Sequence, residues 1–193
     1  MNWAFQEVPL QPIPFWFLRH GETDWNAQGI SQGNVDIPLN AIGIAQARAA
    51  AERLRNRGIA TIVSSPLSRA RVTAEFVAEA LGLPIAIDPD LREVAFGVQE
   101  GQKMSGWFAD WVSGTFTPEG AESFAALRHR AVAAANRATA QPPAVLLVAH
   151  GALFRSLRSA MGIEPNLRTQ NAVPIFCAPP SPGAPHWSLR PVV

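Results

Sequence analysis

The chain has 193 residues, of which 48% are hydrophobic and 16% are charged, and its formal net charge at pH 7 is +1. A chain of this length can bury one substantial core, which predicts a single domain over residues 1–193. The small net charge supplies no basic field to attract nucleic acid or an anionic membrane, so we expect neither as a partner. The lone cysteine, Cys177, excludes an intramolecular disulfide and a multi-cysteine metal site.

Residues 1–14 form an N-terminal extension before the first predicted strand. They contain no basic residue and no long apolar core, so they do not resemble a signal peptide. No run in the chain approaches the roughly 18 apolar residues of a membrane-spanning helix. These patterns predict a cytoplasmic protein. We expect a monomer or a homodimer, because the sequence does not distinguish the two.

The first predicted strand leads directly into polar and small residues. The apolar run Phe15-Trp16-Phe17-Leu18 has the length and aromatic content of a buried strand, and Arg19-His20-Gly21 follows it at once. An isolated Arg-His-Gly is more often structural, with the arginine capping a carbonyl and the histidine satisfied in a turn. Its interpretation therefore depends on which residues follow the other predicted strands.

Helical and strand-like segments alternate along the rest of the chain. A helix is predicted over residues 41–57, with Ile42, Ala45, Ala49 and Leu54 on its packed side, and another over residues 68–81. Strands are predicted near 60–64, 85–88 and 144–149, and the last of these, as the most apolar stretch, is expected in the middle of the sheet. Further elements are helices over 122–139 and 150–161 and strands over 171–178 and 186–190.

Residues 89–120 have weak periodicity and are rich in aromatic side chains. Trp107, Phe108, Trp111 and Phe116 are interspersed with glycines. One interpretation is a small helix that packs its aromatic side chains over the sheet edge. Another is a short lid over residues 101–120 that forms a pocket wall for the organic part of a ligand. The two interpretations are compatible.

Each of the first four predicted strands is followed by a residue whose side chain can bind an anion or take part in catalysis. Arg69 follows the second strand, Glu93 the third and His150 the fourth, as His20 follows the first. In open α/β sheets, ligands bind beyond the carboxyl ends of the strands, so these side chains should converge.

At these residues the sequence resembles the histidine phosphatases, also called the phosphoglycerate mutase-like superfamily, and within it the small phosphatases. The matching segments are 18–26, 32–40, 64–70, 91–93, 96–97, 100–101 and 149–151, in the family's order and spacing. The resemblance implies an α/β fold, a three-layer α/β/α sandwich with a mostly parallel central sheet and an antiparallel edge strand. It implies no metal and no organic cofactor.

The residue types at these positions suit phosphoryl transfer. Guanidinium groups bind phosphate oxygens in pairs and stay charged, which suits Arg19 and Arg69 to a tetrahedral dianion. Neutral imidazole is a nucleophile at pH 7, so His20 can accept a phosphoryl group. The second imidazole, His150, can be cationic beside phosphate oxygens, which raise its pKa.

A carboxyl group is needed to protonate the leaving alkoxide and later to take a proton from water. Glu93 is placed for this role, and Asp90 is a competitor by position. Glu93 is preferred because it aligns with the acid of the family's Leu-x-Glu motif.

The resemblance assigns roles residue by residue. It implies His20 as the phosphorylated nucleophile and Glu93 as proton donor and acceptor. The implied phosphate pocket consists of Arg19, Arg69 and His150, with Asn26 as a further contact and with Thr23 and Gln32 lining it. Gly21 is expected to be small because the phosphoryl group approaches the backbone there.

The leading hypothesis is therefore hydrolysis of a small phosphorylated metabolite through phosphohistidine. Mutase activity is the alternative from the same chemistry, but mutases of the family usually carry a longer excursion than residues 101–120. A non-catalytic phospholigand-binding protein is a second alternative, although His20 and Glu93 are both present. A metallohydrolase with His20, His150 and Glu93 as zinc ligands is a third. Departures from the family pattern at Ala95, 98–99 and Ala121 leave the substrate open.

Overall fold

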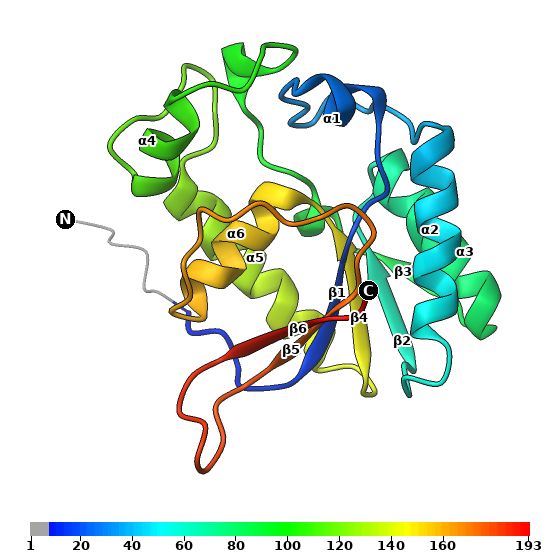
Figure 1. Cartoon of the computed structure of the whole chain (residues 1–193). Coiled ribbons are helices and arrows are strands. Elements are labelled where there is room, and N and C mark those ends of the chain that lie inside the picture. The colour runs from blue at the N-terminus through cyan, green and yellow to red at the C-terminus, as the bar shows by residue number, and fades with distance from the viewer. Residues whose placement is uncertain (1–7) are drawn as a thin grey trace.

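The computed structural model describes residues 8–193, and its framework is a six-stranded sheet with helices on both faces (Figure 1). The strands are β1 (Phe15–Arg19), β2 (Thr61–Ser64), β3 (Ile85–Ile87), β4 (Val145–Ala149), β5 (Ile175–Ala178) and β6 (Ser188–Pro191). Their order is β3-β2-β4-β1-β5-β6. The first four are parallel, β5 runs antiparallel to β1, and β6 antiparallel to β5. This confirms the predicted α/β/α fold with its mostly parallel sheet.

The helices form the two outer layers. They are α1 (Asp24–Gln28), α2 (Ala41–Leu54), α3 (Ser68–Leu81), α4 (Trp107–Ser113), α5 (Phe124–Thr139) and α6 (Gly151–Ala160), with short 3₁₀ turns at Pro89–Leu91 and Gly97–Gln99. In Figure 1, α2 and α3 cover one face of the sheet, and α5 and α6 cover the other. None of the helices within residues 8–193 is long and apolar enough to cross a membrane.

The side chains of β1 alternate between the two cores. Phe15 and Phe17 pack with α5 and α6, whereas Trp16 and Leu18 pack with α2 and α3. Phe17 stacks on Phe154 of α6 with ring centroids 4.0 Å apart. The predicted central strand β4 is buried along its whole length between β1 and β2, as its uninterrupted apolar sequence requires. Because both faces of β1 and β4 are packed, their carboxyl ends are fixed in position.

The packed face of α2 differs from the predicted one. Gly43, Ala47, Ala50 and Leu54 are among its buried residues, whereas Ile42 is 57% exposed. The reason is a close backbone approach, since a Cβ at Gly43 would lie 2.0 Å from the carbonyl oxygen of Glu22. Small residues allow the helix to pack tightly against the loop after β1. That contact, rather than burial of the larger side chains, determines how the helix is rotated.

Other boundaries differ by a few residues. The helix predicted over 41–57 ends at Leu54, and the two last strands begin at Ile175 and Ser188, later than expected. Of the predicted N-terminal extension, residues 1–7 lie outside the described part. Leu10 joins the core, and the amide N–H of Gln11 donates to Asn136 Oδ1 at 2.9 Å. This part of the extension therefore packs against α5.

The aromatic segment around α4 packs against α5 and also contributes to a pocket wall. Trp111 is fully buried, and its Nε1 donates to the Glu122 carbonyl at 2.9 Å. Phe108 belongs to the same core and also lines the cavity described below. Phe116 is 46% exposed and does not line that cavity. The helix is thus mainly a packing element, with Phe108 as its contribution to a pocket wall.

Candidate active site

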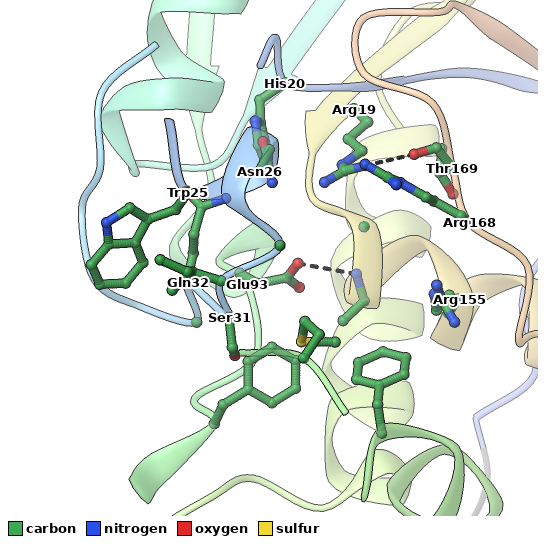
Figure 2. Close-up of a pocket in the computed structure, with 18 of the residues that line it drawn as sticks. Arg19, His20, Trp25, Asn26, Ser31, Gln32, Glu93, Arg155, Arg168 and Thr169 are labelled. Atoms are coloured by element: carbon green, nitrogen blue, oxygen red, sulfur yellow. Dashed lines mark hydrogen bonds between the residues drawn. The ribbon is translucent and has the colours of Figure 1, made fainter. Parts of the chain in front are cut away.

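A cavity of about 300 Å³ lies where β1, β2 and β4 end (Figure 2). Six predicted site residues line it, namely Arg19, His20, Asn26, Gln32, Arg69 and Glu93. Three others, Gly21, Thr23 and His150, are buried nearby but are not among the residues that line it. Segments that are far apart in the sequence therefore meet at the carboxyl edge of the sheet, as the strand pattern predicts.

His20 is held in one tautomer at the end of β1. Its Nδ1 lies 2.7 Å from the Gly21 carbonyl oxygen, which can only accept, so Nδ1 carries the proton. The other ring nitrogen, Nε2, has no hydrogen-bond partner within residues 8–193 and keeps its lone pair. Burial, reinforced by the charges of Arg19 and Arg69, lowers the pKa of His20 well below its ordinary value. His20 is therefore a neutral imidazole with an unblocked nucleophilic nitrogen.

His150 lies next to His20, with the ring centroids 5.2 Å apart. Its Nε2 is 2.7 Å from Ser65 Oγ, and that hydroxyl oxygen also accepts the Leu67 N–H at 3.3 Å. Because a hydroxyl can donate one hydrogen bond and accept two, this contact is compatible with either tautomer of His150. The Nδ1 of the same ring is buried and unpartnered among the described residues. The ring of His150 therefore has one nitrogen that residues 8–193 leave without a hydrogen bond.

Burial, followed by the charge of Arg69, lowers the pKa of His150 well below its ordinary value. The protein's own electrostatic field therefore keeps this ring neutral. The cationic His150 expected from the sequence depends on the charge of a phosphate group beside it, and stays a prediction.

Two arginines are fixed by backbone carbonyls rather than by acids. Arg69 donates to the carbonyls of Val35 and Gly33, both at 2.8 Å, and Arg19 donates to the Thr169 carbonyl at 2.6 Å. Burial lowers the pKa of Arg19 to about 10, so it stays cationic at neutral pH. Because carbonyls orient a guanidinium without an ion pair, both arginines keep a positive charge that can attract an anion.

The carboxyl group of Glu93 is attached to the start of α6. Its Oε2 accepts the Ala152 N–H at 3.0 Å, as Figure 2 shows, and its Oε1 accepts the Leu153 N–H at 3.0 Å and the Val94 N–H at 3.1 Å. The first amides of a helix have no partner within the helix, so Glu93 satisfies two of them. The competitor Asp90 does not line the cavity and pairs with Arg137 at 2.7 Å.

Asn26 and Gln32 reach the cavity because Thr23 holds them. Thr23 Oγ1 accepts the Asn26 N–H at 3.2 Å, which caps α1, and donates to Gln32 Oε1 at 3.0 Å. Asn26 Oδ1 accepts from Asn171 Nδ2 at 3.2 Å. The amide nitrogen of Asn26 remains for a ligand. Thr23 itself is fully buried and acts as a positioning residue.

Gly21 is small for a reason other than the predicted one. A Cβ at this position would lie 2.3 Å from the Gly43 carbonyl oxygen in α2, and Gly21 does not line the cavity. The close approach is therefore between two backbone segments rather than between the backbone and a phosphoryl group. Its effect on the site is indirect, because the Gly21 carbonyl sets the tautomer of His20.

Several site residues were not found from the sequence. Asn171 donates to the His20 carbonyl at 2.9 Å, and Arg155, Arg168 and Thr169 line the cavity. Ser65 lies within a matching motif, but only its contact with His150 gives it a role. An apolar wall completes the cavity and consists of Trp25, Ile30, Phe96, Met104 and Phe108.

The metallohydrolase alternative is not supported. No three His, Cys, Asp or Glu side chains within residues 8–193 are placed to hold one metal ion. Glu93 is instead engaged by backbone amides, and His150 by a serine hydroxyl.

A family model described as the histidine phosphatase superfamily (branch 1) matches residues 15–174. The chain therefore belongs to the histidine phosphatase superfamily. Among curated proteins, it is 40% identical over 176 residues to a protein named probable phosphoglycerate mutase GpmB from Yersinia pestis (strain Pestoides F), a match that covers 82% of this chain and 81% of the relative.

Solved structures of phosphatases are similar in fold. A mycobacterial glucosyl-3-phosphoglycerate phosphatase solved with VO3 is 31% identical, with a TM-score of 0.79 over 94% of this chain and 98% of the other. A phosphoserine phosphatase from Entamoeba histolytica, solved with 3-phosphoglyceric acid, is 25% identical, with a TM-score of 0.76 over 91% of this chain and 94% of the other. The protein is thus an enzyme-family member whose named relatives include both phosphatases and mutases.

Proposed function

We propose that the protein hydrolyses the phosphomonoester of a small metabolite through a phosphohistidine on His20. The observation that carries this proposal is the state of the His20 ring. Its Nδ1 proton is held by the Gly21 carbonyl, its Nε2 has no hydrogen-bond partner within residues 8–193, and the residue lines a cavity that Arg19 and Arg69 also line. A neutral nucleophile next to two oriented cations is the arrangement that phosphoryl transfer needs.

In the first step, Nε2 of His20 attacks phosphorus while the bond to the ester oxygen breaks. Arg19 and Arg69 bind the nonbridging oxygens and stabilise the charge that is spread over them. The charge of the phosphoryl group would raise the pKa of His150, and a proton on its Nδ1 would make that ring an additional donor for one of these oxygens. The leaving oxygen takes a proton from the Glu93 carboxyl group, so the alcohol departs neutral.

In the second step, water attacks the phosphohistidine and the bond between phosphorus and Nε2 breaks. Glu93, now a carboxylate, takes the proton from this water, so each turnover returns it to its starting state. Inorganic phosphate then leaves, and His20 is again a neutral imidazole. Because Glu93 is fixed by three backbone N–H groups, it keeps one position for both proton transfers.

Mutase activity is a second candidate, favoured by the names of the curated relatives that are 40% identical. It shares the first step, but a hydroxyl of a sugar acid would replace water in the second. The shortness of the excursion over residues 101–120 supports hydrolysis, because a short excursion gives water access to the phosphohistidine.

The test measures phosphate release and formation of 2-phosphoglycerate in the same assay. The purified protein is incubated with 3-phosphoglycerate and, separately, with a panel of sugar phosphates, ribazole phosphate and p-nitrophenyl phosphate, and ³¹P NMR detects phosphate and 2-phosphoglycerate. We expect release of inorganic phosphate with little 2-phosphoglycerate. Efficient conversion to 2-phosphoglycerate without phosphate release would replace hydrolysis by mutase activity. No reaction on any ester would favour the non-catalytic binding protein.

A further inference from the structure

The cavity contains two arginines that the proposed phosphoryl transfer does not use. Arg155 comes from α6, and Arg168 from the segment between α6 and β5. Figure 2 shows both on the Arg19 side of the cavity, across from Trp25, Gln32 and Ser31. They therefore form one wall next to the place where the phosphoryl group would bind.

Neither arginine forms an ion pair with an acidic side chain among residues 8–193. Arg168 is exposed and makes no hydrogen bond or ion pair with residues 8–193. Arg155 lies over the Phe108 ring at 4.6 Å and donates to Asn166 Oδ1, a neutral group. Stacking on an aromatic ring and one amide contact hold the guanidinium in place while leaving its charge available.

The charges that line the cavity do not balance. Four guanidiniums line it with a single carboxyl group, Glu93, and the lining imidazole of His20 is neutral. The lining therefore has a net charge of +3 with Glu93 ionised and of +4 with the protonated Glu93 that the first step needs. A phosphoryl dianion would leave at least one positive charge uncompensated, so a second anionic group on the substrate would be attracted to this wall.

We propose that Arg155 and Arg168 bind a carboxylate on the organic part of the substrate, so that the enzyme prefers small phosphomonoesters that carry a carboxylate near the phosphoryl group. This rests on the proposed function for the group that is transferred. The planar guanidiniums match the two oxygens of a carboxylate. The apolar side chains of Trp25, Met104 and Phe108 would contact the carbon skeleton, and a volume of about 300 Å³ accommodates a small acid.

The first test compares two substrates that differ at one carbon. In 3-phosphoglycerate a carboxylate replaces the CH₂OH group of glycerol 3-phosphate. We expect wild-type kcat/KM for release of phosphate to be about 10–100-fold higher for the acid, as charge-assisted hydrogen bonds predict. In Arg168→Gln and in Arg155→Gln, the ratio of the two kcat/KM values should fall about tenfold or more.

Two further variants separate a specific carboxylate site from a general loss of charge. Arg168→Lys keeps the positive charge but loses the planar pair of N–H donors. Its ratio of kcat/KM values should therefore lie between those of the wild type and of Arg168→Gln. Arg71→Gln removes an exposed arginine of α3 that pairs with Glu75 outside the cavity, and should leave the ratio unchanged. A ratio near one in the wild type, or a ratio that neither cavity variant changes, would overturn the proposal.

A binding measurement keeps this proposal distinct from the proposed hydrolysis. The variant His20→Ala lacks the nucleophile, so its affinity for both esters can be measured by calorimetry without turnover. A Kd at least about tenfold lower for 3-phosphoglycerate, lost on adding Arg168→Gln, supports the carboxylate site even if the wild type hydrolyses neither ester. Equal Kd values in a protein whose wild type hydrolyses both would overturn the carboxylate site alone.

Discussion

The inner and outer parts of the cavity are built differently. At the inner end, His20, Arg19 and Arg69 are oriented by backbone carbonyls of Gly21, Thr169, Gly33 and Val35. The outer part consists of Arg155 and Arg168. Among residues 8–193, Arg155 contacts the Phe108 ring and the Asn166 side chain, and Arg168 is exposed. The difference indicates that the reacting groups are fixed by the main chain, while selectivity depends on side chains that can change without disturbing the sheet.

Replacing the nucleophile should have the largest effect at the inner end. His20→Ala removes the nitrogen that attacks phosphorus, so we expect kcat to fall by about four orders of magnitude or more. The acid-labile phosphoenzyme should disappear as well, which radiolabelled substrate and rapid quench would detect. The matched control is His186→Ala, because His186 is exposed and lies outside the cavity. Substantial turnover by His20→Ala would remove His20 from the mechanism.

Glu93→Gln should have the next largest effect, and one that depends on the leaving group. For an alkyl phosphate we expect a loss of about 10²–10⁴-fold in kcat, because the alkoxide then leaves without a proton. p-Nitrophenyl phosphate should lose far less, since its phenolate hardly needs protonation. The variant also loses an acceptor for the α6 amides, but that structural loss would slow both substrates equally. Equal slowing would therefore count against Glu93 as the general acid.

The contact between Gly21 and α2 should matter chiefly for stability. Gly21→Ala would place a methyl group 2.3 Å from the Gly43 carbonyl oxygen, and separating the two segments should reduce the free energy of unfolding by about 1–3 kcal/mol. Gly106→Ala is the control, because its Cβ would meet no atom within 4 Å and its φ is −56°. Urea titration of both variants measures the difference. A Gly21→Ala protein as stable as Gly106→Ala would mean that the two segments separate at no cost.

Local patterns were sufficient to predict much of the fold. Both ends of α3 were predicted, because its apolar spacing is regular and Gly82 ends it in a left-handed conformation. The predicted rotation of α2 was wrong. The observed rotation depends on the contact between Gly43 and Glu22, two residues too far apart in the sequence for helical periodicity to relate them. Periodicity ranks residues by hydrophobicity, whereas here a close approach of two backbones decided the packing.

Sequence patterns predicted the inner part of the cavity but not the outer part. Residues that directly follow strands, such as His20, could be placed from the sequence because parallel strands end at one edge. Arg155 lies within an amphipathic helix and Arg168 in a segment without periodicity, so both resembled ordinary surface arginines. Only the tertiary structure shows that they line the cavity.

The smallest predicted effect is a pH dependence of stability that arises at the inner end. Burial lowers the pKa of His20 and of His150, so below about pH 6.5 the unfolded chain binds protons that the folded protein does not, and stability falls as pH decreases. Arg19 and Arg69 face both rings and reinforce this, whereas the Gly21 carbonyl opposes it at His20. Between pH 7.5 and 5.5 the loss is at most about 1.4 kcal/mol for each histidine.

His150→Asn should remove up to half of that loss, because asparagine does not titrate. Arg168→Gln in the outer part should leave the pH dependence unchanged, because the guanidinium stays charged throughout this range. Urea denaturation at several pH values measures the free energy of unfolding for each protein. A wild-type stability that is flat from pH 7.5 to 5.5 would mean that folding does not lower the pKa of either ring, which would contradict the effect of burial at the inner end.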